Sequence, residues 1–257
     1  MVDKKMALLT GRSFLLKSRP YIFCRACIST TSARASNGSI EDLSNGKLYE
    51  LRTYAIKPDK FGEFTKIMQE GYMLRTAHSK LIGYWSTDLG GVNEVVHIWE
   101  YDNYSHRTAV RKALSQDKDW IEKCFSRILP MFANQTNVVL KAFPWCKLQL
   151  EPGQGNPGVF ELVSYQVKSG LVSQFEHRLL QDYPQLNYNP LGLWYSVFGD
   201  INRVYSLLRY DSLDQREKVV AKANDDEVVR ETMRDLDKYL DGTVKKALVP
   251  TTFSALQ

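Results

Sequence analysis

The sequence predicts an α+β fold in which two ferredoxin-like βαββαβ repeats form an intrachain dimeric α/β barrel. The first observation behind this prediction is an internal repeat. YELRTYAIK at 49–57 returns as FELVSYQVK at 160–168, and LIGYWSTDLGGVNEVVHIWEYD at 81–102 returns as PLGLWYSVFGDINRVYSLLRYD at 190–211. The second observation is the same order of strand and helix patterns in both copies, and the third is a glycine- and proline-rich segment between them. Self-similarity of this kind has to be interpreted before any single motif.

The first copy begins with a strand, a helix and a hairpin. Residues 47–57 alternate in polarity and are rich in strand formers. Pro58 then opens a helical pattern, since proline suits the first turn of a helix. Two further strands, 82–88 and 94–101, are joined by residues 89–93, where two glycines allow a turn.

A second helical region and a last strand complete the first copy. Asp102 or Ser105 can cap the helix, whose apolar face continues to Leu129 with a break near 115–117. Residues 137–143 form the last predicted strand. The unit therefore has the βαββαβ order of a ferredoxin-like fold.

The second copy repeats this order. Its pattern predicts a strand at 159–168, a helix near 171–182, a hairpin at 191–210, helices between 212 and 241, and a strand near 244–249. A unit of this kind carries helices on one face of its sheet only. Two units in one chain can bury their bare faces against each other, which predicts the barrel.

Four segments make up the predicted domain organisation. A leader at 1–45 precedes the first repeat at 46–145, a linker at 146–158 and the second repeat at 159–257. The linker is predicted from its prolines and glycines. Residues 1–40 hold seven basic residues and one acidic residue, and the rest of the chain is close to neutral. The basic charge therefore belongs to the leader and does not indicate nucleic-acid binding.

The leader has the composition of a mitochondrial transit peptide, rich in Arg, Ser and Ala and poor in acid. The alternative is a disordered basic tail. We expect a mitochondrial protein, in the matrix or associated with the surface, with the cytosol as the alternative. No apolar run approaches the roughly 18 residues of a membrane span. Cys24 and Cys27 have no partner pair at metal-binding spacing, and neither a metal nor a cofactor is predicted.

Strand alternation gathers polar side chains on one face of the first copy. We expect them to line a cavity inside the barrel, able to hold an anionic or aromatic small ligand. The candidate residues are Glu50, Arg52, Tyr54, His78, Tyr84, His97 and Trp99, with His78 at a helix end near the mouth. The alternative is that Glu50 and Arg52 only satisfy neighbouring groups in a polar layer between the sheets.

Comparison of the two copies separates structural residues from candidate ligand-binding residues. Tyr101 and Arg107 recur in the second copy, which indicates a shared structural role. Arg52 and His97 do not recur, so a ligand site belongs to the first copy only. His106, in the first turn of a helix, is interpreted as solvated or capping. No nucleophile with a base accompanies the cluster, and no catalytic residue is assigned.

Several motifs together resemble the NipSnap family over residues 47–253. They are YELRTYAIKPDK, LRTAHSKLIGYW, HIWEYDNYSHRTAVRKAL and, in the second copy, FELVSYQVK. The resemblance implies a mitochondrially associated protein of dimeric α/β barrel fold without established enzymatic activity. It further implies links to mitochondrial quality control (mitophagy) through autophagy-adaptor proteins, or to vesicle trafficking.

Two classes of function follow from these observations. The favoured one is a noncatalytic mitochondrial scaffold that presents surfaces to other proteins, with self-association into a homo-oligomer also open. The alternative is a small-molecule-binding protein or a cofactor-independent, oxygenase-like enzyme that uses a polar barrel cavity in the first repeat. The fold alone does not choose between them, because function depends on the site.

Overall fold

A computed structural model describes residues 46–150, 157–182 and 190–257. The predicted leader at 1–45 lies outside the described residues, and so do 151–156 of the predicted linker. In the part of the chain that is described, no helix is long and apolar enough to cross a bilayer.

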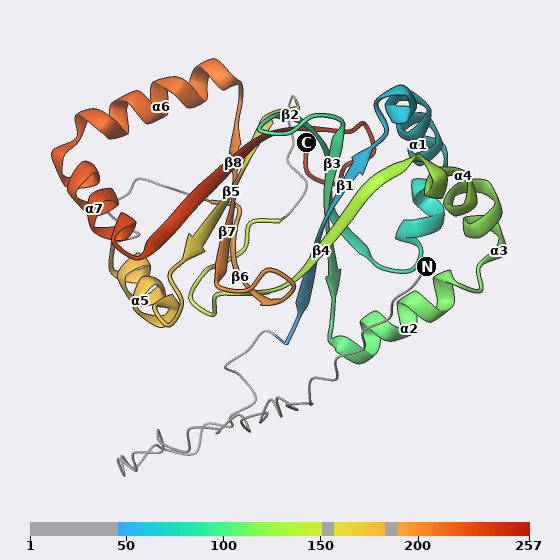
Figure 1. Cartoon of the computed structure of the whole chain (residues 1–257), viewed down its shortest axis with the longest axis horizontal. Helices are drawn as coiled ribbons and strands as arrows, with labels where there is room; N and C mark the ends of the chain where they lie inside the picture. Colours follow the sequence, from blue (N-terminus) through green and yellow to red (C-terminus); the bar gives the residue numbers. More distant parts are fainter. Residues whose placement is uncertain (1–45, 151–156, 183–189) are drawn as a thin grey trace, which may run out of the picture. The chain divides into compact units, whose positions relative to one another are not determined.

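Eight antiparallel strands form one closed barrel in the order β1-β3-β2-β8-β5-β7-β6-β4 (Figure 1). The first repeat supplies β1 (Leu48–Ile56), β2 (Lys80–Leu89), β3 (Glu94–Tyr101) and β4 (Phe132–Ala142). The second supplies β5 (Val159–Val167), β6 (Gly192–Phe198), β7 (Arg203–Tyr210) and β8 (Leu240–Pro250). Each repeat has the ferredoxin-like strand order, and β2 with β8 and β4 with β6 form the two seams. The predicted fold class is therefore confirmed.

The helices of the first repeat lie on one side of the barrel and those of the second repeat on the opposite side (Figure 1). The first set is η2 (Pro58–Lys60), α1 (Phe61–Thr76), α2 (Tyr104–Leu114), α3 (Lys118–Trp120), the π-helical η3 (Ile121–Phe125), α4 (Ser126–Ile128) and η4 (Leu129–Met131). The second set is α5 (Val172–Asp182), α6 (Leu213–Asp225) and α7 (Glu227–Asp237). Both sets pack on the outer faces of their sheets.

The cap of α2 is Asn103, which corrects the prediction of Asp102 or Ser105. Asn103 has an extended backbone, and its Oδ1 accepts a hydrogen bond from the His106 N–H at 2.8 Å. An N-cap must directly precede the first helical residue. Because β3 ends at Tyr101 and α2 begins at Tyr104, the N-cap is Asn103. His106 Nδ1 accepts from the Asp102 N–H at 3.1 Å, which agrees with the interpretation of His106 as a solvated or capping residue.

The last strand of each repeat begins earlier than predicted. β4 starts at Phe132 instead of residue 137, and β8 starts at Leu240 instead of near 244. The first residues of both strands are largely exposed. Because neither face is buried there, the sequence carries no alternation that would reveal the strand.

The barrel interior and the two outer layers form separate apolar cores. The interior core joins side chains of both repeats, among them Leu51, Ile98, Trp194 and Leu207. A second core lies between the first sheet and its helices, and a third between the second sheet and its helices. β3 of the first repeat is therefore buried on both faces.

The C-terminal segment of the second repeat packs onto the first repeat. The Thr251 N–H donates to the Tyr84 carbonyl oxygen at 3.0 Å, and the Tyr84 N–H donates to Ser254 Oγ at 2.9 Å. Phe253 stacks on Tyr72 with ring centroids 4.9 Å apart and contacts Tyr84 at 5.0 Å. These contacts of the C-terminal segment fix the position of Tyr84.

Candidate functional site

A cavity of about 540 Å³ lies between the outer face of the first sheet and its helices. Its sheet side is lined by Arg52, Tyr54, Tyr84, His97 and Trp99, with Arg75 from α1. Its helical side is largely apolar, with Met68, Leu114, Trp120, Ile121, Ile128 and Leu129 among the lining residues. The exposed residues of the lining mark its mouth, and they are Arg111, Ser115, Phe125, Ser126, Leu129 and Gln135.

The predicted position of these side chains inside the barrel is wrong. β1 and β3 alternate, and Tyr49, Leu51, Val96 and Ile98 occupy the face that meets the second repeat. The polar face turns outward and is covered by helices. The opposite, more apolar face was the one suited to the interior, because burial of apolar surface drives the contact between the sheets.

The structure brings five of the seven predicted site residues together in the cavity lining and places two elsewhere. The lining residues are Arg52, Tyr54, Tyr84, His97 and Trp99. Glu50 and His78 are absent from the lining. Arg75 and Arg111 belong to the lining although sequence reasoning did not assign them to the site. The only signal for Arg75 was its helical spacing with Tyr72 and His78.

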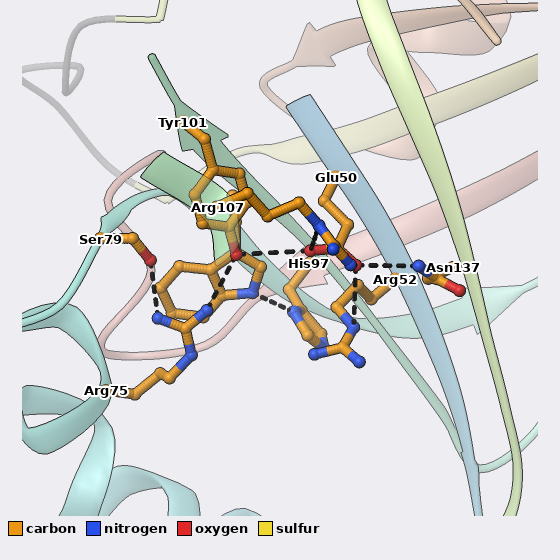
Figure 2. A network of polar contacts seen from close by, with 9 residues as sticks. Glu50, Arg52, Arg75, Ser79, His97, Tyr101, Arg107 and Asn137 are labelled. Atoms are coloured by element: carbon orange, nitrogen blue, oxygen red, sulfur yellow. Dashed lines mark hydrogen bonds and ion pairs between the residues drawn. The ribbon is translucent and has the colours of Figure 1, made fainter. Parts of the chain in front are cut away.

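Glu50 is the centre of a buried charge network (Figure 2). It is 1% exposed and accepts hydrogen bonds from Arg107 Nη2 at 2.8 Å, Arg107 Nε at 3.2 Å and Asn137 Nδ2 at 2.9 Å. Tyr101 Oη donates to it at 3.3 Å. Burial acts to raise the pKa of Glu50, but the hydrogen bonds and charges of Arg107 and Arg52 hold that pKa below its ordinary value. Glu50 is therefore an ionised framework residue.

The same framework occurs in the second repeat. Arg216 Nη2 donates to Glu161 Oε1 at 2.7 Å, and Tyr210 Oη donates to Glu161 at 3.4 Å. Because this arrangement recurs where the cavity-lining residues do not, it serves the fold. The structural role predicted for Tyr101 and Arg107 is confirmed.

Arg75 reaches from α1 to the sheet. Its side chain donates from Nη1 to Ser79 Oγ at 2.6 Å and from Nη2 to Tyr101 Oη at 3.1 Å, and its guanidinium lies 3.8 Å from the centroid of the Trp99 ring (Figure 2). Within the described segments no carboxylate forms an ion pair with it. Burial lowers the pKa of Arg75, although interactions with Tyr101 oppose this. The hydroxyl groups of Ser79 and Tyr101 and the face of the Trp99 ring therefore stabilise its positive charge.

His97 is 3% exposed and lies in an aromatic box. Its ring stacks on Tyr84 with centroids 4.7 Å apart and meets the edge of Tyr54 at 4.7 Å. Burial, followed by the charges of Arg52 and Arg75, holds the pKa of His97 well below its ordinary value. Trp99 Nε1–H donates to His97 Nδ1 at 2.6 Å. A neutral imidazole that accepts at Nδ1 carries its proton on Nε2, so His97 is a hydrogen-bond donor at Nε2.

Three buried polar atoms of the cavity residues have no hydrogen-bond partner among the residues that the structure describes. They are Arg52 Nε, Tyr84 Oη and His97 Nε2. Arg52 Nε has an ion-pair contact of 3.9 Å with Glu50. Leaving a buried polar group unpaired costs about 1–3 kcal/mol. All three atoms belong to residues that line the cavity.

The second repeat fills the equivalent layer with apolar side chains. Val163 stands at the position of Arg52, and Leu193 and Ser206 pair in register where Tyr84 and His97 pair in the first repeat. Phe175, Leu179, Leu193, Val204, Val229 and Leu236 form the core between this sheet and its helices. The polar wall is thus a property of the first repeat.

His78 joins two helices next to the cavity. Its Nε2 lies 2.8 Å from Asp117 Oδ2, and Asp117 Oδ1 accepts from the Trp120 N–H at 3.0 Å. The Trp120 N–H and then His78 lower the pKa of Asp117. His78 therefore ties the end of α1 to the start of α3.

Fold and cavity define this chain as a two-repeat α/β-barrel protein with a ligand-sized cavity, polar on its sheet side, under the helices of one repeat. The family model described as NIPSNAP matches residues 49–147 and 160–255. The chain is 39% identical over 219 residues to mouse protein NipSnap homolog 3B, covering 83% of this chain and 87% of that one. It is 38% identical over 218 residues to human protein NipSnap homolog 3A, with the same two coverages. The chain belongs to the NipSnap family.

Two solved structures share the barrel fold at low sequence identity. An anthrone oxidase-like protein has a TM-score of 0.60 at 12% identity, covering 82% of this chain and 95% of its own. A putative monooxygenase from Lactobacillus acidophilus has a TM-score of 0.54 at 15% identity, covering 80% of this chain and 94% of its own. At these identities the likeness concerns the fold alone.

Proposed function

We propose that this NipSnap protein binds a small organic molecule in the cavity of its first repeat. The observation that carries the proposal is the wall of three buried, unpaired polar atoms, Arg52 Nε, Tyr84 Oη and His97 Nε2. A volume of about 540 Å³ falls in the range of small-molecule sites. The combination of an apolar helical side with a few convergent polar groups is typical of such sites.

Binding is better supported than oxygenase-like chemistry. Abstraction of a proton from a substrate requires an acceptor atom within hydrogen-bond reach of the reacting group. His97 carries its proton on Nε2, because Nδ1 accepts the Trp99 N–H. Arg52 and Arg75 are donors as well. The wall therefore holds and orients a ligand, and it offers no strong base.

The test is to recover the bound molecule. Protein purified under native conditions is examined by native mass spectrometry, and the extracted small molecules are identified. We expect an additional mass with the wild type and its loss with Arg52→Met. Lys80→Met is the matched control, since it removes one positive charge from the same repeat at a side chain outside the cavity lining. Retention of the mass by Arg52→Met would contradict the proposal.

A screen covers the case in which the ligand is lost during purification. A panel of small acids, amides, amines and phenols is tested for a rise in Tm of the wild type. If no mass is recovered and no compound raises the Tm, the binding proposal fails.

We also propose that the protein acts in mitochondria as a protein-interaction scaffold in quality control or trafficking. Family membership and the basic, acid-poor leader at 1–45 support this second proposal. The test is import of the full chain into isolated mitochondria, followed by proximity labelling in cells. Failure of import, or labelling that enriches no autophagy-adaptor or other partner, would count against it.

A further inference from the structure

The charges around the first-repeat cavity do not balance. In the network of Figure 2, Glu50 is the one carboxylate among the residues shown, and Arg52, Arg75 and Arg107 are cationic. Arg107 donates two hydrogen bonds to the carboxylate of Glu50. Arg52 Nε lies 3.9 Å from Glu50 Oε1. Arg75 is 6% exposed and donates hydrogen bonds to the hydroxyl groups of Ser79 and Tyr101.

The cavity lining itself adds no negative charge. Asp and Glu are absent from the lining in the described part of the chain, whereas Arg111 adds a further cation at the mouth. A buried positive charge without a counterion is costly, since the interior solvates ions poorly. An anion in the cavity would remove this cost.

Three donors lie in one row across the sheet. Arg52 of β1 and Tyr84 of β2 are both register partners of His97 on β3. Their side chains share the outward face, and each has an unpaired polar atom. A carboxylate has two oxygens with about four acceptor positions, which is enough for three donors. A neutral imidazole N–H in the middle of the row suits an oxygen acceptor.

The opposite wall excludes a purely polar ligand. The helical side carries the apolar side chains of Trp120, Ile121, Ile128 and Leu129, of which Leu129 is half exposed. The ligand body that covers them must therefore be hydrocarbon or aromatic.

Resting on the binding function proposed above, we infer that the ligand is a carboxylic acid with an apolar body. Its carboxylate lies on the row of Arg52, His97 and Tyr84, and its body lies against the helical wall. The charge of the ligand offsets that of Arg52 and Arg75, and Arg111 faces the route by which an anion enters.

Matched probes test the head group. Binding of 2-naphthoate and decanoate to the full chain is compared with binding of 2-naphthamide and decanamide by calorimetry. We expect each carboxylate to bind at least about tenfold more tightly than its amide, the difference of one charge-assisted hydrogen bond. Arg52→Met should remove this preference and change amide affinity little, and Lys80→Met should retain it. Arg52→Lys, which keeps the charge without the planar fork, should retain part of it.

The outcomes separate this inference from the binding function. Equal affinity of carboxylates and amides for the wild type would overturn the inference and leave small-molecule binding standing. A preference that survives Arg52→Met would also overturn it, because the anion would then be bound elsewhere. Failure of all four probes to bind would overturn the inference, and the molecule recovered by mass spectrometry would decide the binding function separately.

Discussion

Buried charged residues of the first sheet divide into a framework and a ligand-facing set. Glu50 belongs to the framework, and sequence comparison could have revealed it, because Glu161 stands at the matching place in FELVSYQVK. Arg52 and His97 were predictable as first-repeat features for the same reason. Arg75 was not, since its role depends on how α1 lies over Trp99, which no local pattern contains.

His97 makes folding sensitive to mild acid. Its pKa is well below the ordinary value of about 6.5 in the folded protein, whereas in the unfolded chain it is near that value. Below about pH 6.5 the unfolded chain therefore binds a proton that the folded protein does not. The free energy of unfolding falls as pH decreases, by up to about 1.4 kcal/mol per pH unit for this one group. The charged and titratable groups that face it are Arg52, Arg75, Tyr54 and Tyr84.

The measurement is urea unfolding at pH 7.5, 6.5 and 5.5. We expect His97→Gln to reduce the loss of stability between pH 6.5 and 5.5 by about 1 kcal/mol. The glutamine amide keeps an acceptor for Trp99 and a donor toward the cavity. His106→Gln is the control, because Gln215 fills the matching position in the second repeat. A pH slope unchanged by His97→Gln would contradict a lowered pKa of His97 in the folded protein.

Alternation along the strands predicted which side chains share a face but not what each face meets. The pairing of β1, β2 and β3 followed from patterns within 54 residues of sequence, from Leu48 to Tyr101. Assignment of the polar face to the helices required comparison with the opposite face, where Leu51 and Ile98 are apolar. The exposed starts of β4 and β8 carry no periodicity at all.

The equivalent N-caps of α2 and α6 allow a test of whether α2 supports the cavity. Asn103 Oδ1 accepts from the His106 N–H at 2.8 Å, and Ser212 Oγ accepts from the Gln215 N–H at 3.1 Å. Asn103→Ala and Ser212→Ala should each lower the free energy of unfolding by about 1 kcal/mol, since each removes one N-cap. Urea unfolding measures both.

The two cap variants should differ at the cavity. α2 contributes Arg111 and Leu114 to the lining, whereas α6 lies on the other repeat. We expect Asn103→Ala to speed amide exchange in α2 and to weaken binding of 2-naphthoate, and Ser212→Ala to leave binding unchanged. Equal binding by both variants would mean that the α2 terminus does not support the cavity.

At the scale of the whole molecule, the barrel exists because each repeat alone is incomplete. The first repeat has open edges at β2 and β4, and the second has open edges at β8 and β6. Each also carries an apolar sheet face that is buried only by the other repeat. The internal sequence repeat predicted this closure, but not the C-terminal segment that crosses from the second repeat to Tyr84.

Separated repeats should therefore reassemble. We expect chains of residues 46–150 and 157–257 to self-associate when expressed alone and to form a one-to-one complex when coexpressed, because only the pair closes both seams and buries the interior core. Size-exclusion chromatography with light scattering gives the stoichiometry, and the fluorescence of Trp85 and Trp194, both fully buried in the interior core, reports its formation. Leu51→Glu, which places a charge in that core, should abolish the complex. Stable monomers of either half would contradict the dependence of one repeat on the other.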